Sequence, residues 1–123
     1  MLWHRKLSQK RLKSCLKSTR FTRKRMPGGD AKVLCKIFNP YGSGSWYITE
    51  AEKLQNGDYR CFGLVNLYET ELGYFMLSEL LNARINVFGL RMPLERDTYF
   101  VGKTLRDAYK DCGAVCIFDK KAA

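Results

Sequence analysis

The segment KVLCKIFNPYGSGSWYIT, residues 32–49, sets the fold that the sequence predicts. From Lys32 to Phe38 the odd positions are all apolar and the even positions include Lys36, which is the alternation of a β-strand with one fully buried face. Residues 39–45 hold a proline and two glycines, and these residue types favour a turn because they supply the required φ angles. Trp46 to Thr49 is aromatic and β-branched, so it predicts the partner strand of a hairpin.

Turn signals divide the chain downstream of this hairpin into short elements. We expect in turn a polar stretch from Glu50 to Asp58 with a tight turn at Asn56-Gly57, a strand from Tyr59 to Leu67 with a bulge at Gly63, a turn from Glu69 to Gly73, and a short strand that begins at Tyr74.

The last third of the chain predicts two short helices. We expect a helix that Ser78 opens and that ends near Arg84, an irregular stretch over residues 85–97 broken by Gly89 and Pro93, a short strand at Thr98–Val101, a helix at Lys103–Asp111, and an edge strand at Val115–Phe118. The predicted fold class is therefore α+β: an antiparallel β-sheet with two or three short helices packed on it.

The N-terminal 29 residues form a separate segment. A loose apolar stripe predicts a short helix over residues 7–18, and the Met26-Pro27-Gly28-Gly29-Asp30 break marks its boundary with the domain. We therefore divide the chain into a basic N-terminal extension, residues 1–29, and a single α+β domain, residues 30–123.

The net charge of +10 comes entirely from this extension. Residues 30–123 contain 12 basic and 12 acidic side chains, whereas residues 1–29 contain ten basic side chains and no acidic one. The ten are Arg5, Lys6, Lys10, Arg11, Lys13, Lys17, Arg20, Arg23, Lys24 and Arg25.

A cationic segment of this kind concentrates near polyanions, and nucleic acid is the first candidate. An organellar transit peptide and a solubilising tail are the alternatives for the same segment. No apolar run approaches the length of about 18 residues that a membrane span needs, and no apolar stretch of a secretory signal follows the basic residues. We expect a cytoplasmic protein with no membrane partner.

The five cysteines predict free thiols rather than disulfides. An odd number of cysteines without a secretory signal is typical of a reducing compartment, and Cys35 and Cys61 lie in apolar runs where a thiol packs as a small hydrophobe. Cys112 and Cys116 would need two more ligands to hold zinc, and the only histidine is His4. We therefore expect no metal and no other cofactor.

No catalytic motif stands out in the sequence. The predicted domain has no histidine for a nucleophile–base pair and the chain has no P-loop motif. Clustered carboxylates occur at Glu50 and Glu52, at Glu69 and Glu71, and at Glu95-Arg96-Asp97. Such clusters can bind Mg²⁺ or transfer protons, so a metal-dependent enzyme that processes nucleic acid stays an alternative.

Aromatic and charged side chains near the predicted turns form a candidate recognition face. Its members are Tyr41, Trp46, Tyr47, Glu71, Tyr74, Glu95, Arg96 and Asp97. The competing interpretation is that the aromatics belong to the sheet core, and on that basis we expect Trp46 and Tyr74 to be largely buried.

Several of these segments resemble a known family when they are read in order. They are Trp46-Tyr47-Ile48-Thr49-Glu50, Glu71-Leu72-Gly73-Tyr74 and Glu95-Arg96-Asp97-Thr98-Tyr99-Phe100. The chain is similar over residues 31–110 to a family of small proteins of unknown function carried on plasmids, integrative elements and phages. The resemblance implies no chemistry, but it implies the company of antirestriction and anti-CRISPR genes. The basic extension and the tail from Cys112 to Ala123 depart from the family pattern.

Charge and resemblance together predict a non-enzymatic protein from a mobile element. It would bind nucleic acid or a host nucleoprotein and inhibit a host defence system, of the anti-CRISPR or antirestriction type, by occlusion. A plain protein-interaction module is a further alternative. RNA and DNA are not distinguished at this level, and neither is the oligomeric state.

A first prediction concerns metal. Because the sequence offers no complete ligand set, EDTA should leave the thermal unfolding midpoint of the protein unchanged. Thermal denaturation followed by circular dichroism checks this expectation. A midpoint that falls on chelation and recovers with zinc would show that Cys112 and Cys116 are metal ligands.

Overall fold

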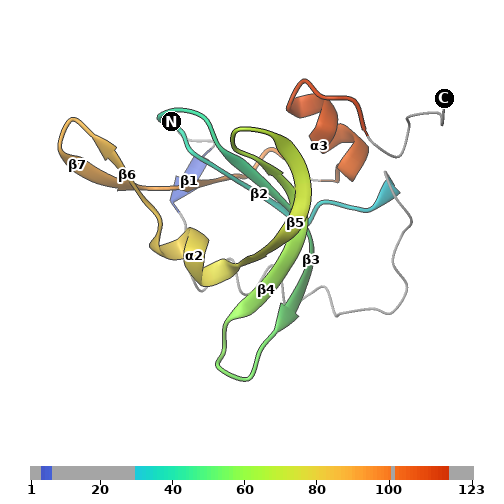
Figure 1. The fold of residues 1–123 in the computed structure, drawn as a ribbon, viewed down its shortest axis with the longest axis horizontal. Coiled ribbons are helices and arrows are strands. Elements are labelled where there is room, and N and C mark those ends of the chain that lie inside the picture. Colours follow the sequence, from blue (N-terminus) through green and yellow to red (C-terminus); the bar gives the residue numbers. More distant parts are fainter. Residues whose placement is uncertain (1–3, 7–29, 101, 117–123) are drawn as a thin grey trace.

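The computed structural model describes residues 4–6, 30–100 and 102–116. A six-stranded sheet, antiparallel at every pairing, dominates the fold in the order β1-β8-β2-β3-β4-β5, and a separate two-stranded sheet pairs β6 with β7 (Figure 1). The strands are β1 His4–Lys6, β2 Cys35–Phe38, β3 Ser45–Lys53, β4 Tyr59–Asn66, β5 Thr70–Met76, β6 Arg84–Val87, β7 Leu90–Pro93 and β8 Glu95–Asp97. Two helices occur in the described residues, α2 Leu77–Asn82 and α3 Leu105–Asp111. The α+β prediction is thereby confirmed at the level of fold class.

The hairpin of β2 and β3 is the one that the sequence predicts, although β2 begins at Cys35 and not at Lys32. Cys35 pairs with Ile48 and Phe38 with Ser45, so the register is continuous up to the turn. Asn39 closes that turn because its side-chain oxygen accepts a hydrogen bond from the backbone N–H of Tyr41, and its own N–H donates to the carbonyl oxygen of Gly44. β3 then runs to Lys53, well beyond the predicted end at Thr49.

A β-bulge in β3 lies opposite Gly63 of β4. The register shifts between Ile48 and Glu50, and Gly63 pairs with Ile48 at that point. The bend brings the two backbones so close that a Cβ on Gly63 would lie 1.8 Å from the carbonyl oxygen of Tyr47. Only glycine fits there, which is why the expected bulge and this glycine coincide.

Each face of the sheet carries its own hydrophobic cluster, and α2 and α3 lie on opposite sides of the sheet (Figure 1). The α2 side buries Cys35, Ile37, Ile48, Ala51, Tyr59, Cys61, Phe75, Leu77, Leu80 and Leu94. The α3 side buries Val33, Tyr47, Leu64, Phe100, Leu105, Ala108, Tyr109 and Cys116. The expected burial of Cys35 and Cys61 is confirmed, and burial raises the pKa of the Cys61 thiol to about 12.

Side-chain hydrogen bonds near the N-terminus hold each helix in place. The Asp58 carboxylate, which comes from the turn between β3 and β4, accepts hydrogen bonds from the backbone N–H and the hydroxyl of Ser78 at the start of α2. Thr104 and Asp107 form a reciprocal capping box at the start of α3. The backbone hydrogen bond from Thr104 lowers the pKa of the Asp107 carboxyl.

Several predicted turns are in fact strands. Residues 50–53 belong to β3 and residues 70–73 to β5, where charged side chains are compatible with a strand because one face of each stays in water. The stretch 85–97, predicted as irregular, contains β6, β7 and β8. Its Gly89 is a turn residue with φ of 86° and its Pro93 ends a strand of a two-stranded sheet, so neither residue breaks the pairing.

Other predictions differ at the ends of elements or lie outside the described residues. Thr98 and Tyr99 form a turn rather than a strand, and residues 115–116 are not in a strand. Tyr74 is 65% exposed, so the expectation that it is buried is wrong, whereas Trp46 is partly buried against the α2-side cluster. The predicted helix at 7–18 and residues 117–118 lie outside the described residues.

In the described part of the chain, neither helix combines the length and the hydrophobicity that crossing a bilayer requires.

The close approach at Gly63 generates a prediction with an internal control. Replacing Gly63 with Ala should lower the free energy of unfolding by about 2–3 kcal/mol or more, because the new methyl group meets backbone that cannot move aside. Gly73 pairs with Gly63 on the neighbouring strand, and a Cβ there meets nothing within 4 Å. Gly73→Ala should therefore change stability by about 1 kcal/mol or less. Equal effects of the two substitutions in urea denaturation would contradict the close approach.

Candidate functional site

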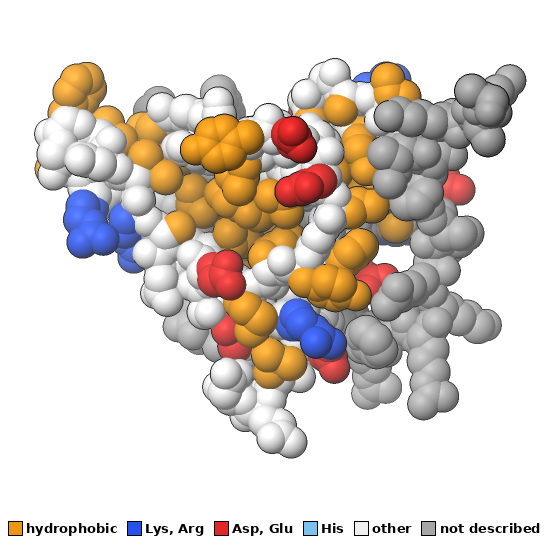
Figure 2. All heavy atoms as spheres, in the orientation of Figure 1, with side chains coloured by type: hydrophobic (Ala, Val, Ile, Leu, Met, Phe, Trp, Pro, Cys, Tyr) orange, Lys and Arg blue, Asp and Glu red, His pale blue; other side chains and the backbone are white. Residues whose placement is uncertain are grey.

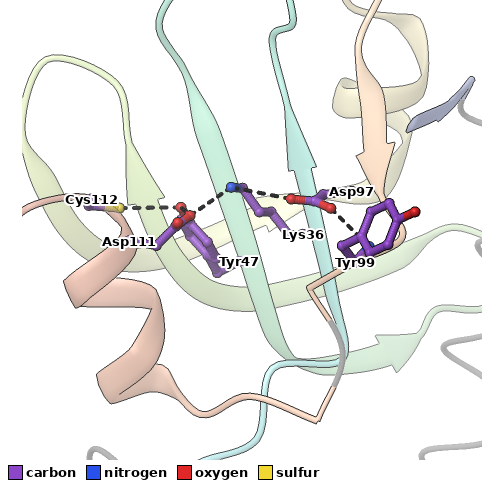
Figure 3. Close-up of polar contacts among 6 residues, drawn as sticks. All are labelled: Lys36, Tyr47, Asp97, Tyr99, Asp111 and Cys112. Carbon is purple, nitrogen blue, oxygen red and sulfur yellow. Dashed lines mark hydrogen bonds and ion pairs between the residues drawn. The ribbon is translucent and has the colours of Figure 1, made fainter. Parts of the chain in front are cut away.

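The densest group of chemically versatile side chains in the described residues surrounds Lys36. Lys36 lies in β2 between two residues of the opposite face, Cys35 and Ile37, so strand alternation turns it toward α3. Its side chain is only 13% exposed. A cation so far out of water needs partners, and Figure 3 shows them arranged around its amino group.

Two carboxylates from distant parts of the chain hold the Lys36 cation. Its Nζ lies 2.6 Å from Asp111 Oδ2, at the end of α3, and 3.6 Å from Asp97 Oδ2, at the end of β8. The other oxygen of Asp97 accepts a hydrogen bond from the backbone N–H of Tyr99, which orients that carboxylate (Figure 3). A single lysine therefore ties the helix and the neighbouring strand to the centre of the sheet.

Three aromatic rings complete the surroundings of the ammonium group. Nζ lies 5.4 Å from the ring centroid of Tyr47, 5.5 Å from that of Phe100 and 5.7 Å from that of Phe38. The rings of Tyr47 and Phe100 also meet edge to face, with their centroids 5.2 Å apart. The negative faces of such rings attract a desolvated cation, so they add to the two ion pairs.

Tyr47 and Cys112 extend the network into the protein interior. The Tyr47 hydroxyl donates to Asp111 Oδ2 at 2.6 Å, and Cys112 Sγ donates to the Tyr47 hydroxyl at 3.5 Å. Burial and the hydrogen bond to Asp111 raise the pKa of Tyr47 far above its ordinary value, and burial raises that of Cys112. Burial opposes ionisation of Asp111 too, but hydrogen bonds from Lys36 and Tyr47 outweigh it, so the pKa of this carboxyl lies below its ordinary value.

The contacts of the network fit a structural role, and the directions of these pKa shifts agree with it. A nucleophilic thiol or phenol needs a lowered pKa, whereas Cys112 and Tyr47 both stay protonated. Among the residues that the structure describes, no three His, Cys, Asp or Glu side chains gather closely enough to hold a metal ion. The arrangement is suited to fastening α3 to the sheet.

The candidate recognition face is divided between the two sides of the sheet. Tyr47 and Asp97 belong to the Lys36 network, whereas Trp46 packs on the α2 side. Strand alternation and the cross-strand register place Glu71 and Arg96 on that same α2 side. The remaining members are Tyr41, exposed in the β2–β3 turn, Glu95, partly buried at the start of β8, and Tyr74, exposed on β5.

Tyr74 instead joins a small aromatic platform with Phe62 and Arg60. The platform lies on the α3 side of the sheet, two residues along β4 and β5 from the cross-strand pair of buried Leu64 and partly buried Leu72. The ring centroids of Tyr74 and Phe62 are 4.9 Å apart, and the Arg60 guanidinium lies 5.7 Å from the Tyr74 ring centroid. An exposed ring beside a cation is one arrangement on which a nucleobase can stack.

The basic residues of the extension fall mostly outside the described part of the chain. Arg5 and Lys6 lie in β1, the edge strand that pairs with β8. The other eight, Lys10, Arg11, Lys13, Lys17, Arg20, Arg23, Lys24 and Arg25, lie outside the described residues.

Sequence reasoning did not identify Lys36 or Asp111. One signal was present for Lys36, since a lysine at the centre of an otherwise apolar strand must find a buried partner. No comparable signal marks Asp111, because 75 residues separate the two and only the packing of α3 brings them together.

Comparison with known proteins identifies a family but gives no activity for it. A family model described as "Protein of unknown function (DUF2958)" matches residues 7–114. No curated protein and no solved structure matches the chain. The resemblance noted in the sequence was likewise to a family of unknown function, but it was placed at residues 31–110, with the basic extension outside it. The match begins at residue 7 and so includes most of that extension, while the association with mobile elements stays a prediction.

The Lys36 network predicts a specific pH dependence. Lys36→Met should lower the free energy of unfolding by about 1–3 kcal/mol at neutral pH, because Asp97 and Asp111 lose their cation. A lowered carboxyl pKa contributes stability above the unfolded value of about 3.9 and loses it as the pH falls through the folded value. The gap between wild type and variant should thus be constant at neutral pH and shrink below about pH 4.

Chemical denaturation across this pH range measures the gap. Lys53→Met is the matched control, since Lys53 is exposed at the end of β3 and should change stability by about 0.5 kcal/mol or less. Two variants of equal stability at neutral pH would show that the network contributes nothing.

Proposed function

Since the chain belongs to the DUF2958 family, whose function is unknown, we propose from its own residues that it is a non-enzymatic protein that binds nucleic acid and blocks access to it. The basic N-terminal segment supplies the affinity, and the α+β domain supplies the bulk that excludes other proteins. A nucleoprotein is a ligand of the same chemistry, and inhibition of a host defence system is a role that such occlusion would serve.

The separation of charge along the sequence is the observation that carries this proposal. Ten basic side chains and no acidic one stand in residues 1–29, against equal numbers of both signs in the rest of the chain. Several acidic residues of the domain already form ion pairs with its own basic residues, namely Lys36–Asp111, Arg60–Glu52 and Arg106–Asp30. The charge of the extension therefore exceeds what the domain can neutralise, which favours an external polyanion.

The aromatic platform supports nucleic acid over other polyanions. Tyr74 presents a largely exposed ring with the Phe62 ring tilted against it and the Arg60 guanidinium over it, and nucleobases stack on aromatic rings that have a cation close by. An anionic membrane surface offers no flat partner for such a ring. The platform would add interactions of little sequence preference to the phosphate contacts of the extension.

Binding without catalysis agrees with the contacts of three of the domain's carboxylates. Glu52 is engaged with Arg60, and Asp97 and Asp111 are engaged with Lys36. A metal-dependent nuclease needs carboxylates that converge on an open site, and these three are instead turned to lysine or arginine. The observation favours the binding protein over the enzyme that the sequence left as an alternative.

The proposal predicts a salt dependence that neutralising the extension weakens. If about six basic side chains of the full-length protein contact phosphates, the log–log slope of affinity against salt is about −4 to −5. Replacing Arg20, Arg23, Lys24 and Arg25 with Gln should weaken binding and make the slope shallower by about 0.7–0.9 for each phosphate that is no longer neutralised. Fluorescence anisotropy with short DNA and RNA at several salt concentrations measures both quantities.

A charge-matched control separates the extension from net charge. Four exposed lysines in the described part of the domain, Lys32, Lys53, Lys103 and Lys110, carry the same total charge, and changing them to Gln should leave the slope nearly unchanged. Equal weakening by the two quadruple variants, or a wild-type slope near zero, would refute binding through the extension.

A further inference from the structure

The hairpin of β6 and β7 forms an arm that projects away from the main sheet (Figure 1). Its strands are joined by Phe88 and Gly89 alone, with φ of 52° and 86°, so both turn residues are left-handed, as in a type I′ turn. The Asn86 side-chain oxygen accepts a hydrogen bond from the Gly89 N–H and fixes this turn. The arm is short and tightly closed, with Phe88 at its tip.

Phe88 is an unfavourable residue for the stability of this turn. It is the only non-glycine residue with positive φ in the described part of the chain, and Asn or Asp normally occupies its position. Its side chain is fully exposed, at 103%, so no packing offsets the backbone strain. The backbone strain at Phe88 is not compensated by packing, which points to a function for the exposed ring.

The rest of the arm supplies cations and a polar amide beside the ring. Register and strand alternation place Arg84, Asn86 and Arg91 on one face, and Leu90 is exposed on the other. Residues 80–94 contain no acidic side chain. Figure 2 shows the outcome at the left of the molecule, where basic side chains lie along the arm and hydrophobic ones at its tip.

We propose that this arm enters a groove of double-stranded DNA and inserts Phe88 between two base pairs. The inference rests on the proposed function and names its ligand as a duplex that the protein deforms. A two-stranded ribbon fits a DNA groove, and proteins that kink DNA combine an apolar wedge with arginine and asparagine side chains beside it. Arg91 contacts a phosphate that flanks the kinked step, whereas the guanidinium of Arg84 donates to the carbonyl oxygens of Leu81 and Ala83 and fixes the base of the arm to the end of α2.

The duplex is favoured over other ligands by charge and by shape. The arm carries two positive charges and no negative one, complementary to a phosphate-lined groove. A single strand stacks on an open platform such as that of Tyr74 and needs no wedge on a projecting arm. Duplex RNA has a deep, narrow major groove that side chains cannot read, and its minor groove is wide and shallow.

Insertion of a wedge has two measurable consequences. The DNA should bend by an angle in the range of about 20–90°. A duplex with a central nick or unpaired base should bind about tenfold more tightly than the intact duplex, because part of its unstacking is already complete. We expect both effects to depend on Phe88, whereas the salt dependence of binding should depend mainly on the basic residues of the extension.

The test uses the full-length protein and a short duplex with a fluorophore pair at its ends. Energy transfer reports bending, and anisotropy compares the nicked with the intact duplex. Phe88→Asn should abolish the bend and the preference for the nick, while the thermal midpoint is unchanged or higher because Asn tolerates the left-handed turn. Phe88→Trp should keep both effects. Tyr68→Asn removes an equally exposed aromatic from the turn between β4 and β5 and should change neither.

The outcomes distinguish the arm from the proposed function as a whole. Wild-type protein that binds the duplex without bending it, or Phe88→Asn that bends it as wild type does, would overturn the role of the arm and leave the proposed function standing. Binding confined to single strands or to RNA would also overturn it. If the protein binds no nucleic acid at all, the proposed function itself is refuted. The arm would then be expected to contact a protein partner.

Discussion

Lys36 holds the architecture together because its charge cannot be left alone where the fold puts it. The lysine occupies the centre of the sheet, mostly out of water, and its partners come from the end of α3 and the end of β8. Removing this partly buried cation would leave its two carboxylates without their ion pair, so the three elements are coupled energetically as well as spatially. The hydrogen bond from Tyr47 to Asp111 adds β3 to the same unit.

This coupling divides the molecule into a fastened part and a projecting part. The clusters on the two faces of the sheet and the Lys36 network together involve β2, β3, β4, β5, β8 and both helices, and Ile85 of β6 packs against the α2-side cluster at the base of the arm. The arm of β6 and β7 pairs only with itself in the described sheets, and an isolated two-stranded hairpin has little stability of its own. The proposed duplex-binding role uses this division, because a wedge must project from a base that resists the force of insertion.

Particular residues show how far the sequence could predict the fold. The alternation around Lys36, the turn at Asn39 and the glycine opposite the bulge are local signals, and each led to the right element. The charged residues Glu50 and Glu71 led to an incorrect prediction of turns. Charged side chains are typical of loops, but they also occur on the face of a strand that stays in water. Gly89 and Pro93 misled it as well, since both are tolerated at the turn and end of an isolated hairpin.

The candidate sites divide in the same way, for the same physical reason. The sequence by itself determined the separation of charge, the antiparallel α+β class and the free buried thiols, because these follow from composition and from patterns a few residues long. Only the tertiary structure decided that Lys36 meets Asp111, that Tyr74 stands exposed beside Arg60, and that Phe88 projects alone from a left-handed turn. Those facts depend on contacts between residues far apart in the chain, or on the absence of packing around a side chain, and no local pattern encodes either.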